Sequence, residues 1–105
     1  MSRKVVLQVP VDVVVRDRDV LMLNAVNARS RKPGAPVDIS IRTLSVEIGT
    51  SLDTARRALN SCVEEGFLTM RENRLDNGCQ VENSYAVTDR GLAILKAAQA
   101  AGLIE

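Results

Sequence analysis

Apolar residues recur at helical spacing near the middle of the chain. Leu44 and Ile48 lie three and seven residues after Ile41. This spacing places the three side chains on one face of a short amphipathic helix. Ser40 precedes this segment as a candidate N-cap, and Gly49 follows it as a stop signal. The pattern therefore predicts a helix between Ser40 and Gly49.

A second amphipathic helix is predicted from Leu52 to Gly66. Thr50 and Ser51 offer the N-terminal cap, and Gly66 provides the C-terminal stop. One side of this helix is apolar and consists of Ala55, Leu59, Cys62 and Val63. The gap of roughly three residues between the two helices is what a helix-turn-helix requires.

The N-terminal part is less regular. Residues 1–11 contain the valine-rich segment Lys4–Val9, which predicts a strand or an extended arm. Val11–Val15 fits either an extended continuation or the start of a helix. Asp17 is the predicted N-cap of a helix that runs to about Arg29. The Pro- and Gly-containing segment after this helix is predicted to be a loop.

Two strands and a closing helix are predicted after the helix-turn-helix. The strands are Phe67–Asn73 and Ser84–Thr88, and the turn-forming residues Asp76, Asn77 and Gly78 lie between them. Thr88 or Asp89 caps a last helix that ends near Ala101.

The predicted order of elements is strand, three helices, two strands and a final helix. This order indicates an α+β fold, a winged helix-turn-helix with about four helices and a two- to three-stranded antiparallel wing sheet. We expect one domain over residues 1–105, with the helix-turn-helix at 40–66, the wing hairpin at 67–88 and the closing helix at 89–102.

Charge and composition restrict the possible functions. The chain carries 14 basic and 13 acidic residues, for a net charge of +1, so a DNA-binding surface requires the charges to be segregated onto one face. It contains no His and no CxxC pair, so we expect no metal site. Nor does it contain a phosphate-binding glycine loop or a nucleophile–base pair, so we expect neither a cofactor nor an enzyme. The N-terminus does not resemble a signal peptide, and a cytoplasmic location is expected.

The second helix of the predicted pair has a polar face that suits DNA. Arg57 lies nearly opposite the apolar stripe on a helical wheel, with Thr54 and Ser61 expected to flank it on the outward side. Arg56 lies nearer the boundary, within reach of a phosphate, and Asn60 lies between the two arginines.

The N-terminus of the same helix offers further donors. Thr50, Ser51 and Thr54 lie near its free amides and the positive end of its dipole. The acidic residues at the other end indicate that only the N-terminal half enters a groove. In the alternative interpretation, Arg57 pairs with Asp53 four residues earlier and has no role in DNA binding.

Other candidate contacts lie outside this helix. Arg71 and Arg74 lead into the predicted wing loop and are placed to reach a minor groove or a phosphate. Gln80 is a secondary candidate in the loop, where Cys79 is a candidate exposed thiol. Arg42 is placed to contact the DNA backbone from the shorter helix. For the wing and Arg42, ordinary solvated side chains remain the alternative.

Several segments resemble bacterial winged-helix proteins. Ser51–Leu59 and Glu64–Leu68 are similar to the recognition helix and first wing strand of MarR-type regulators and of plasmid and phage replication initiators. Asn83-Ser84-Tyr85 resembles an Asn-x-Tyr signature of the initiator-like group, and Val87–Gly91 resembles the LTDKG start of the closing helix in MarR-type proteins. The resemblance covers about Ile39 to Leu95.

This resemblance implies roles for individual residues. Ser51 and Thr54 would contact phosphate or base, Arg57 would be the main reader, and Arg71 and Arg74 would belong to the wing. The chain lacks the long flanking helices of MarR-type proteins and the second domain of an initiator. We therefore expect no small-molecule ligand, and a complete initiator is not expected either.

The leading hypothesis is a sequence-specific double-stranded DNA-binding protein, a transcriptional repressor that acts as a homodimer. The dimer surface is expected in the alanine-rich last helix, the N-terminal valine strand, or both. The alternatives are a plasmid or phage replication or partition accessory factor, and a winged-helix adaptor that binds protein.

Overall fold

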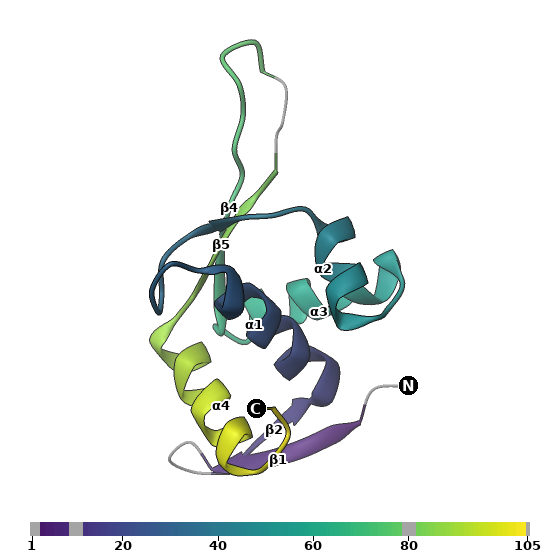
Figure 1. Cartoon of the computed structure of the whole chain (residues 1–105), viewed down its shortest axis with the longest axis vertical. Helices are drawn as coiled ribbons and strands as arrows, with labels where there is room; N and C mark the ends of the chain where they lie inside the picture. The colour runs from purple at the N-terminus through teal and green to yellow at the C-terminus, as the bar shows by residue number, and fades with distance from the viewer. Residues whose placement is uncertain (1–2, 9–11, 79–81, 105) are drawn as a thin grey trace.

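A computed structural model describes residues 3–8, 12–78 and 82–104 (Figure 1). The elements, in chain order, are β1 (Lys4–Gln8), β2 (Asp12–Arg16), α1 (Asp17–Arg29), β3 (Val37–Asp38), α2 (Ile41–Ile48), α3 (Leu52–Glu64), β4 (Leu68–Arg71), β5 (Ser84–Val87) and α4 (Asp89–Ala100). Cys79 and Gln80 lie outside the described residues.

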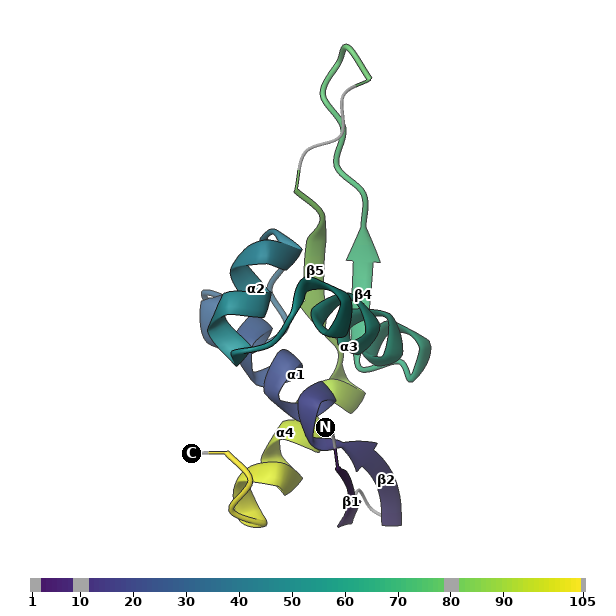
Figure 2. The same ribbon diagram turned by 90° about the vertical axis from the view of Figure 1, so that its right-hand side faces the viewer.

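Helices α1, α2 and α3 pack against one another, and α4 covers the other side of α1 (Figures 1 and 2). The predicted apolar stripes face this core: Leu44, Ala55, Leu59 and Cys62 are buried. Phe67 and Tyr85, the only large aromatic side chains, are also buried. Burial raises the pKa of the Cys62 thiol well above its usual range. This cysteine is therefore a structural residue.

The predicted caps define the helix-turn-helix. The Ser40 and Ser51 hydroxyls each accept a hydrogen bond from the backbone N–H three residues later, at 3.1 Å. Gly49 ends α2 in the left-handed conformation, at φ 69°. After α3, the Phe67 N–H donates to the Cys62 carbonyl at 2.8 Å, across Gly66. These local contacts confirm the positions predicted for the turn and for the end of the second helix.

The wing is the outer part of a three-stranded antiparallel sheet in the order β3-β5-β4. Leu68 is paired with Val87 and Arg71 with Ser84, so the regular ladder is shorter than the predicted strands. Beyond Arg71 the two arms continue as a long projecting loop (Figure 1). Asn73 closes its base, because its side-chain amide donates to Ser84 Oγ at 2.7 Å and to the Glu82 carbonyl at 2.8 Å.

The N-terminal segment forms a separate antiparallel hairpin, with Lys4 paired with Arg16 and Gln8 paired with Asp12. The ambiguous valine segment is thus strand β2. The expectation that Asp17 caps α1 is wrong: Arg16 is the N-cap residue and Asp17 is the first helical residue. The Asp17 carboxylate instead accepts the Arg3 and Arg18 backbone N–H groups, at 2.8 and 2.7 Å. It therefore fixes the corner between hairpin and helix.

The closing helix begins at the predicted cap. The Thr88 hydroxyl accepts the Gly91 N–H at 3.0 Å and donates to the Gly66 carbonyl. Gly91 itself is tightly enclosed, since an added Cβ would lie 2.2 Å from the Phe67 carbonyl oxygen. Among the described residues, no helix is long and apolar enough to cross a membrane.

Candidate nucleic-acid interface

The outward face of α3 carries a mixed set of charged and polar side chains. Asp53, Arg56, Arg57, Asn60 and Glu64 are exposed, whereas the opposite side is buried. The Arg57 side chain is 68% exposed, which confirms its predicted outward orientation. Its position after the turn, on an exposed helix face, is compatible with entry into a DNA groove.

Arg57 is paired within its own helix. One guanidinium nitrogen lies 3.2 Å from a carboxylate oxygen of Asp53, four residues earlier. The ion pair anticipated in the alternative interpretation is therefore present. Both side chains are about two-thirds exposed, and such surface pairs contribute only about 0.2–1 kcal/mol. A phosphate or a guanine can therefore compete with Asp53 for this guanidinium.

The hydroxyl groups at the start of α3 are engaged in its cap. Ser51 Oγ accepts the Thr54 N–H and donates to Thr54 Oγ1 at 3.0 Å. Thr50 and Thr54 are half-buried. Both line a hollow of about 400 Å³ between α1 and the turn, together with Asp17, Arg18, Leu21, Ile48 and Gly49.

Arg18 is a residue that the sequence analysis did not select. It lies on α1, yet it lines the same hollow as Thr50 and Thr54. Its guanidinium is close to Asp19, with Nε 3.4 Å from Oδ1. No local sequence signal places Arg18 beside the turn, because that proximity arises from the packing of α1 on α3.

Ser61 does not belong to the outward face, contrary to the expectation. Its hydroxyl donates to Asp19 Oδ2 at 2.7 Å, in the contact between α3 and α1. The Asp19 side chain is almost fully buried. Burial raises the pKa of this carboxyl above its usual value, although the hydrogen bond from Ser61 and the charge of Arg18 oppose the shift.

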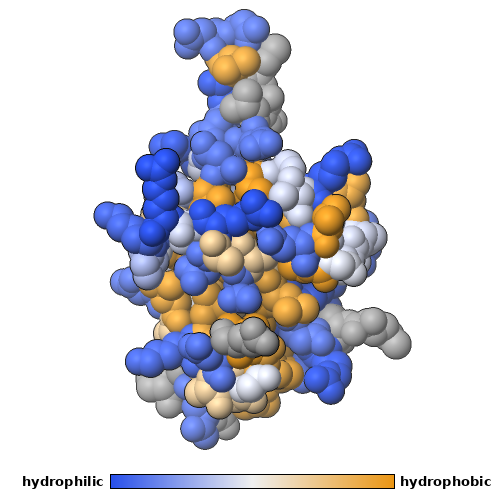
Figure 3. All heavy atoms as spheres, viewed as in Figure 1, coloured by the Kyte–Doolittle hydropathy of each residue, from blue (hydrophilic) through white to orange (hydrophobic). Residues whose placement is uncertain are grey.

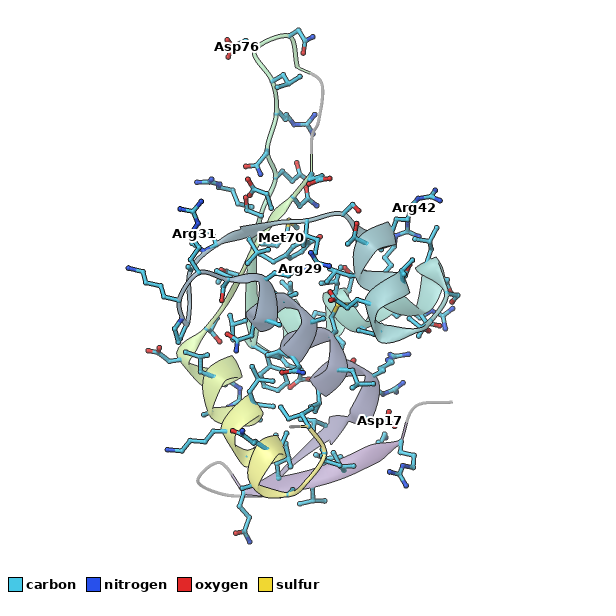
Figure 4. All side chains as sticks on the ribbon, in the orientation of Figure 1. Asp17, Arg29, Arg31, Arg42, Met70 and Asp76 are labelled. Carbon is cyan, nitrogen blue, oxygen red and sulfur yellow. The ribbon has the colours of Figure 1, made fainter. Side chains whose placement is uncertain are left out.

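A groove of about 360 Å³ separates α3 from the wing sheet. Arg56, Asn60 and Glu64 line it from the helix, and Met70, Asn83 and Tyr85 line it from the sheet. Met70 is 45% exposed, and Figure 4 shows it near the base of the wing. Arg56 and Asn60 thus face the wing side of α3, whereas Arg57 does not line this groove.

The wing carries both positively and negatively charged side chains. Arg71 is exposed at the end of β4. Arg74 is held within the loop, with one guanidinium nitrogen 3.3 Å from Glu72 Oε2 and the other 3.4 Å from the Gly78 carbonyl oxygen. The surface of the wing is mainly hydrophilic in Figure 3, and Asp76 lies at its tip in Figure 4. Of the two predicted wing residues, only Arg71 has an unengaged guanidinium among the described contacts.

Arg42 is exposed on α2, and its side chain extends away from the body of the molecule (Figure 4). It borders a hollow of about 430 Å³ with Arg29, Thr43, Val46 and Glu47. Arg29 Nε is 2.8 Å from Glu47 Oε2, so that neighbouring arginine is neutralised.

The predicted site residues therefore fall into three groups. The first is on α3 and its cap, and comprises Thr50, Ser51, Thr54, Arg56, Arg57 and Asn60. The second is the wing pair Arg71 and Arg74, and the third is Arg42. Across the described part of the chain, no group of three His, Cys, Asp or Glu residues could hold a metal ion.

Comparison with solved structures finds a similar fold. No family model and no curated protein matches the chain. The crystal structure of a MarR-family transcriptional regulator from Silicibacter pomeroyi superposes with a TM-score of 0.55 and 19% identity, over 76% of this chain. The chain spans about half of that protein, 47% of its length. The similarity shows the fold, and the predicted α+β winged helix is confirmed.

Proposed function

We propose that this chain is a sequence-specific double-stranded DNA-binding protein, a transcriptional repressor that acts as a homodimer. The observation that carries the proposal is the exposed set Arg56, Arg57 and Asn60 on the helix that follows the turn. The similar solved structure is that of a transcriptional regulator, and this supports the same function. All 105 residues would act as one winged-helix unit.

The N-terminal half of α3 enters the major groove in this proposal. Arg57 leaves Asp53 and forms a bidentate contact with a guanine, for which a planar guanidinium is well shaped. Arg56 and Asn60 contact the neighbouring backbone or base edges from the wing side of the helix. Glu64, at the other end of the same face, keeps the C-terminal half away from phosphate.

The remaining contacts fix the protein on the duplex without reading sequence. Thr50, Ser51 and Thr54 present the α3 N-terminus to a phosphate. Arg71 and Arg74 contact the backbone or minor groove from the wing, and Arg42 does so from α2. Each arginine that neutralises a phosphate releases condensed counterions from the DNA, so these contacts make the affinity depend on salt.

The proposal is tested by measuring binding to the DNA upstream of the protein's own gene at several salt concentrations. Affinity is expected to fall as salt rises, and Arg57→Ala is expected to abolish the preference for the specific site over random DNA. Lys96→Ala is the matched control, since Lys96 is exposed on α4, and this helix and α3 lie on opposite sides of α1 (Figure 2). Absence of binding at low salt, or binding unaffected by Arg57→Ala, Arg56→Ala and Arg71→Ala, contradicts the proposal.

A winged-helix adaptor that binds protein is the second candidate. The charge balance of the outward α3 face favours it, because Asp53 and Glu64 offset Arg56 and Arg57. The exposed Met70 beside that face adds apolar surface. Salt-insensitive binding to a protein, with no binding to DNA, would support this function. A replication or partition accessory role differs only in the location of the DNA site, which mapping the bound sequence would reveal.

A further inference from the structure

Strand β2 is the exposed edge of the N-terminal hairpin. The hairpin is a two-stranded sheet within the described residues, so each strand has one edge without a strand partner. Helix α4 packs beside β1, and β2 lies on the outer side of the hairpin (Figure 2). An exposed strand edge is a row of backbone donors and acceptors that can pair with another strand.

The hairpin also exposes apolar side chains next to this edge. Val6 and Val14 are cross-strand partners, and they are 59% and 61% exposed. The alternate residues Leu7 and Val15 are buried in the core. The burial of Leu7 and Val15 is thus explained by folding of the single chain, whereas the exposure of Val6 and Val14 is not.

The sequence of β2 is complementary to itself in antiparallel pairing. If two copies pair about Val14, that residue opposes its own equivalent and Val13 opposes Val15 of the second copy. In the same register, position 12 opposes position 16, and these positions are acidic and basic, respectively. Opposite charges across an antiparallel pair stabilise it. A two-fold axis through Val14 generates this favourable pairing twice.

Strand β1 lacks this property. Pairing of β1 with itself about Val6 places Lys4 opposite Gln8 of the second copy, with no opposite charges. Helix α4 also packs beside β1 (Figure 2). The charge complementarity therefore selects β2 over β1.

We infer that two copies of this chain associate through antiparallel pairing of their β2 strands, forming a continuous four-stranded sheet in the order β1-β2-β2-β1. The contact is isologous, so it closes at two copies and leaves no further β2 edge for a third. This deepens the dimer of the proposed function by naming its surface and register. Because the contact is short, the dimer is expected to depend on protein concentration.

A charge-reversal experiment on the full chain tests this inference in the absence of DNA. Asp12→Lys and Arg16→Glu are each expected to place like charges at both ends of the β2–β2 contact. Each variant alone is therefore expected to be monomeric in sedimentation experiments. A 1:1 mixture places Lys opposite Glu and Arg opposite Asp. The mixture is therefore expected to recover a dimer of the wild-type sedimentation coefficient.

Lys96→Glu is the matched control, because it reverses an exposed charge on α4 and leaves both strands of the hairpin unchanged. It is expected to dimerise like the wild type. The Arg16 side chain makes no capping hydrogen bond, so its substitution is compatible with folding, which circular dichroism checks for every variant. A monomeric wild type, single variants that remain dimeric, or a mixture that remains monomeric would overturn the inference.

The outcome is separable from that of the DNA proposal. Arg57→Ala lies on α3 and is expected to dimerise normally while losing site preference. Loss of DNA binding with intact charge-dependent dimerisation would contradict the proposed function alone. Retained DNA binding by a protein that never dimerises would contradict the β2 contact and the homodimer, but not the contact of α3 with DNA.

Discussion

Ser61 on α3 donates a hydrogen bond to Asp19 on α1, with 2.7 Å between Oγ and Oδ2. The two residues are 42 positions apart, and the carboxyl group is almost fully buried. The adjacent Cys62 thiol also points to the Asp19 carbonyl oxygen, at 3.5 Å. These contacts fix the exposed helix relative to the core, so they determine which way Arg57 faces.

Removing the hydroxyl in Ser61→Ala is expected to destabilise the fold by about 1–3 kcal/mol, because a buried carboxyl group loses a hydrogen-bond donor. Urea unfolding at neutral pH measures this change. Asn60→Ala is the control, since Asn60 is exposed on the same helix, and it is expected to unfold like the wild type. Equal stability of the Ser61→Ala variant and the wild type would show that this bond does not hold α3 on α1.

Ionisation of Asp19 is expected to lower the free energy of unfolding as pH rises. Burial raises its folded-state pKa above the ordinary value of 3.8, so the folded state binds this proton more tightly than the unfolded state does. The resulting stabilisation is present below the unfolded pKa and is lost as pH rises through the folded pKa. Asp19→Asn keeps an oxygen acceptor for Ser61 but cannot ionise.

The stability of Asp19→Asn relative to the wild type should therefore increase from pH 3.8 upward and become constant above the folded pKa. Urea unfolding of both proteins across this range provides the comparison. A difference that stays constant, or that shrinks as pH rises, contradicts the assignment of this titration to Asp19.

The helix-turn-helix could be predicted from sequence because its boundaries are encoded locally. Ser40 and Ser51 cap helices through atoms three residues away, and Gly49 ends α2 through its own backbone conformation. Such signals need no knowledge of the tertiary structure. The outward orientation of Arg57 followed from helical periodicity for the same reason.

The features that were missed depend on distant parts of the chain. Strand β3 has two residues and exists because Val37 pairs with Tyr85, a pairing that no local pattern reveals. Ser61 has a polar side chain at the edge of the apolar stripe, and only the position of Asp19 on another helix makes it an inward-facing residue. Strand β2 was ambiguous because a run of valines has neither a clear two-residue nor a clear helical period.

Gly91→Ala is expected to destabilise the protein severely. Gly91 is helical, where alanine is ordinarily the better residue. However, the added Cβ would lie 2.2 Å from the Phe67 carbonyl oxygen and 2.8 Å from Val87 Cγ1. Helix α4 would have to move away from the wing sheet, at a cost of roughly 3 kcal/mol.

Thermal unfolding measures this effect, with Lys96→Ala as the control at an exposed position of the same helix. A Gly91→Ala variant as stable as the wild type would mean that α4 can shift without loss of packing. The glycine in the Val87–Gly91 segment would then have no packing role.

Asp53→Asn is expected to strengthen DNA binding, in contrast to the loss predicted for Arg57→Ala. The Asp53 carboxylate lies 3.2 Å from the Arg57 guanidinium, so DNA must displace it before Arg57 can bind a phosphate or a base. Asparagine removes the competing charge and the repulsion between Asp53 and the DNA backbone. The salt dependence of affinity should also become steeper, because more net positive charge faces the phosphates.

Glu47→Gln is the matched control. Glu47 also pairs with an arginine, at 2.8 Å from Arg29, but both residues lie away from the outward face of α3. Glu47→Gln should change the affinity for DNA much less than Asp53→Asn does. Titration of labelled DNA at two salt concentrations measures both. If Asp53→Asn weakens binding and Glu47→Gln does not, Asp53 orients Arg57 for contact with DNA, and the ion pair supports recognition instead of competing with it.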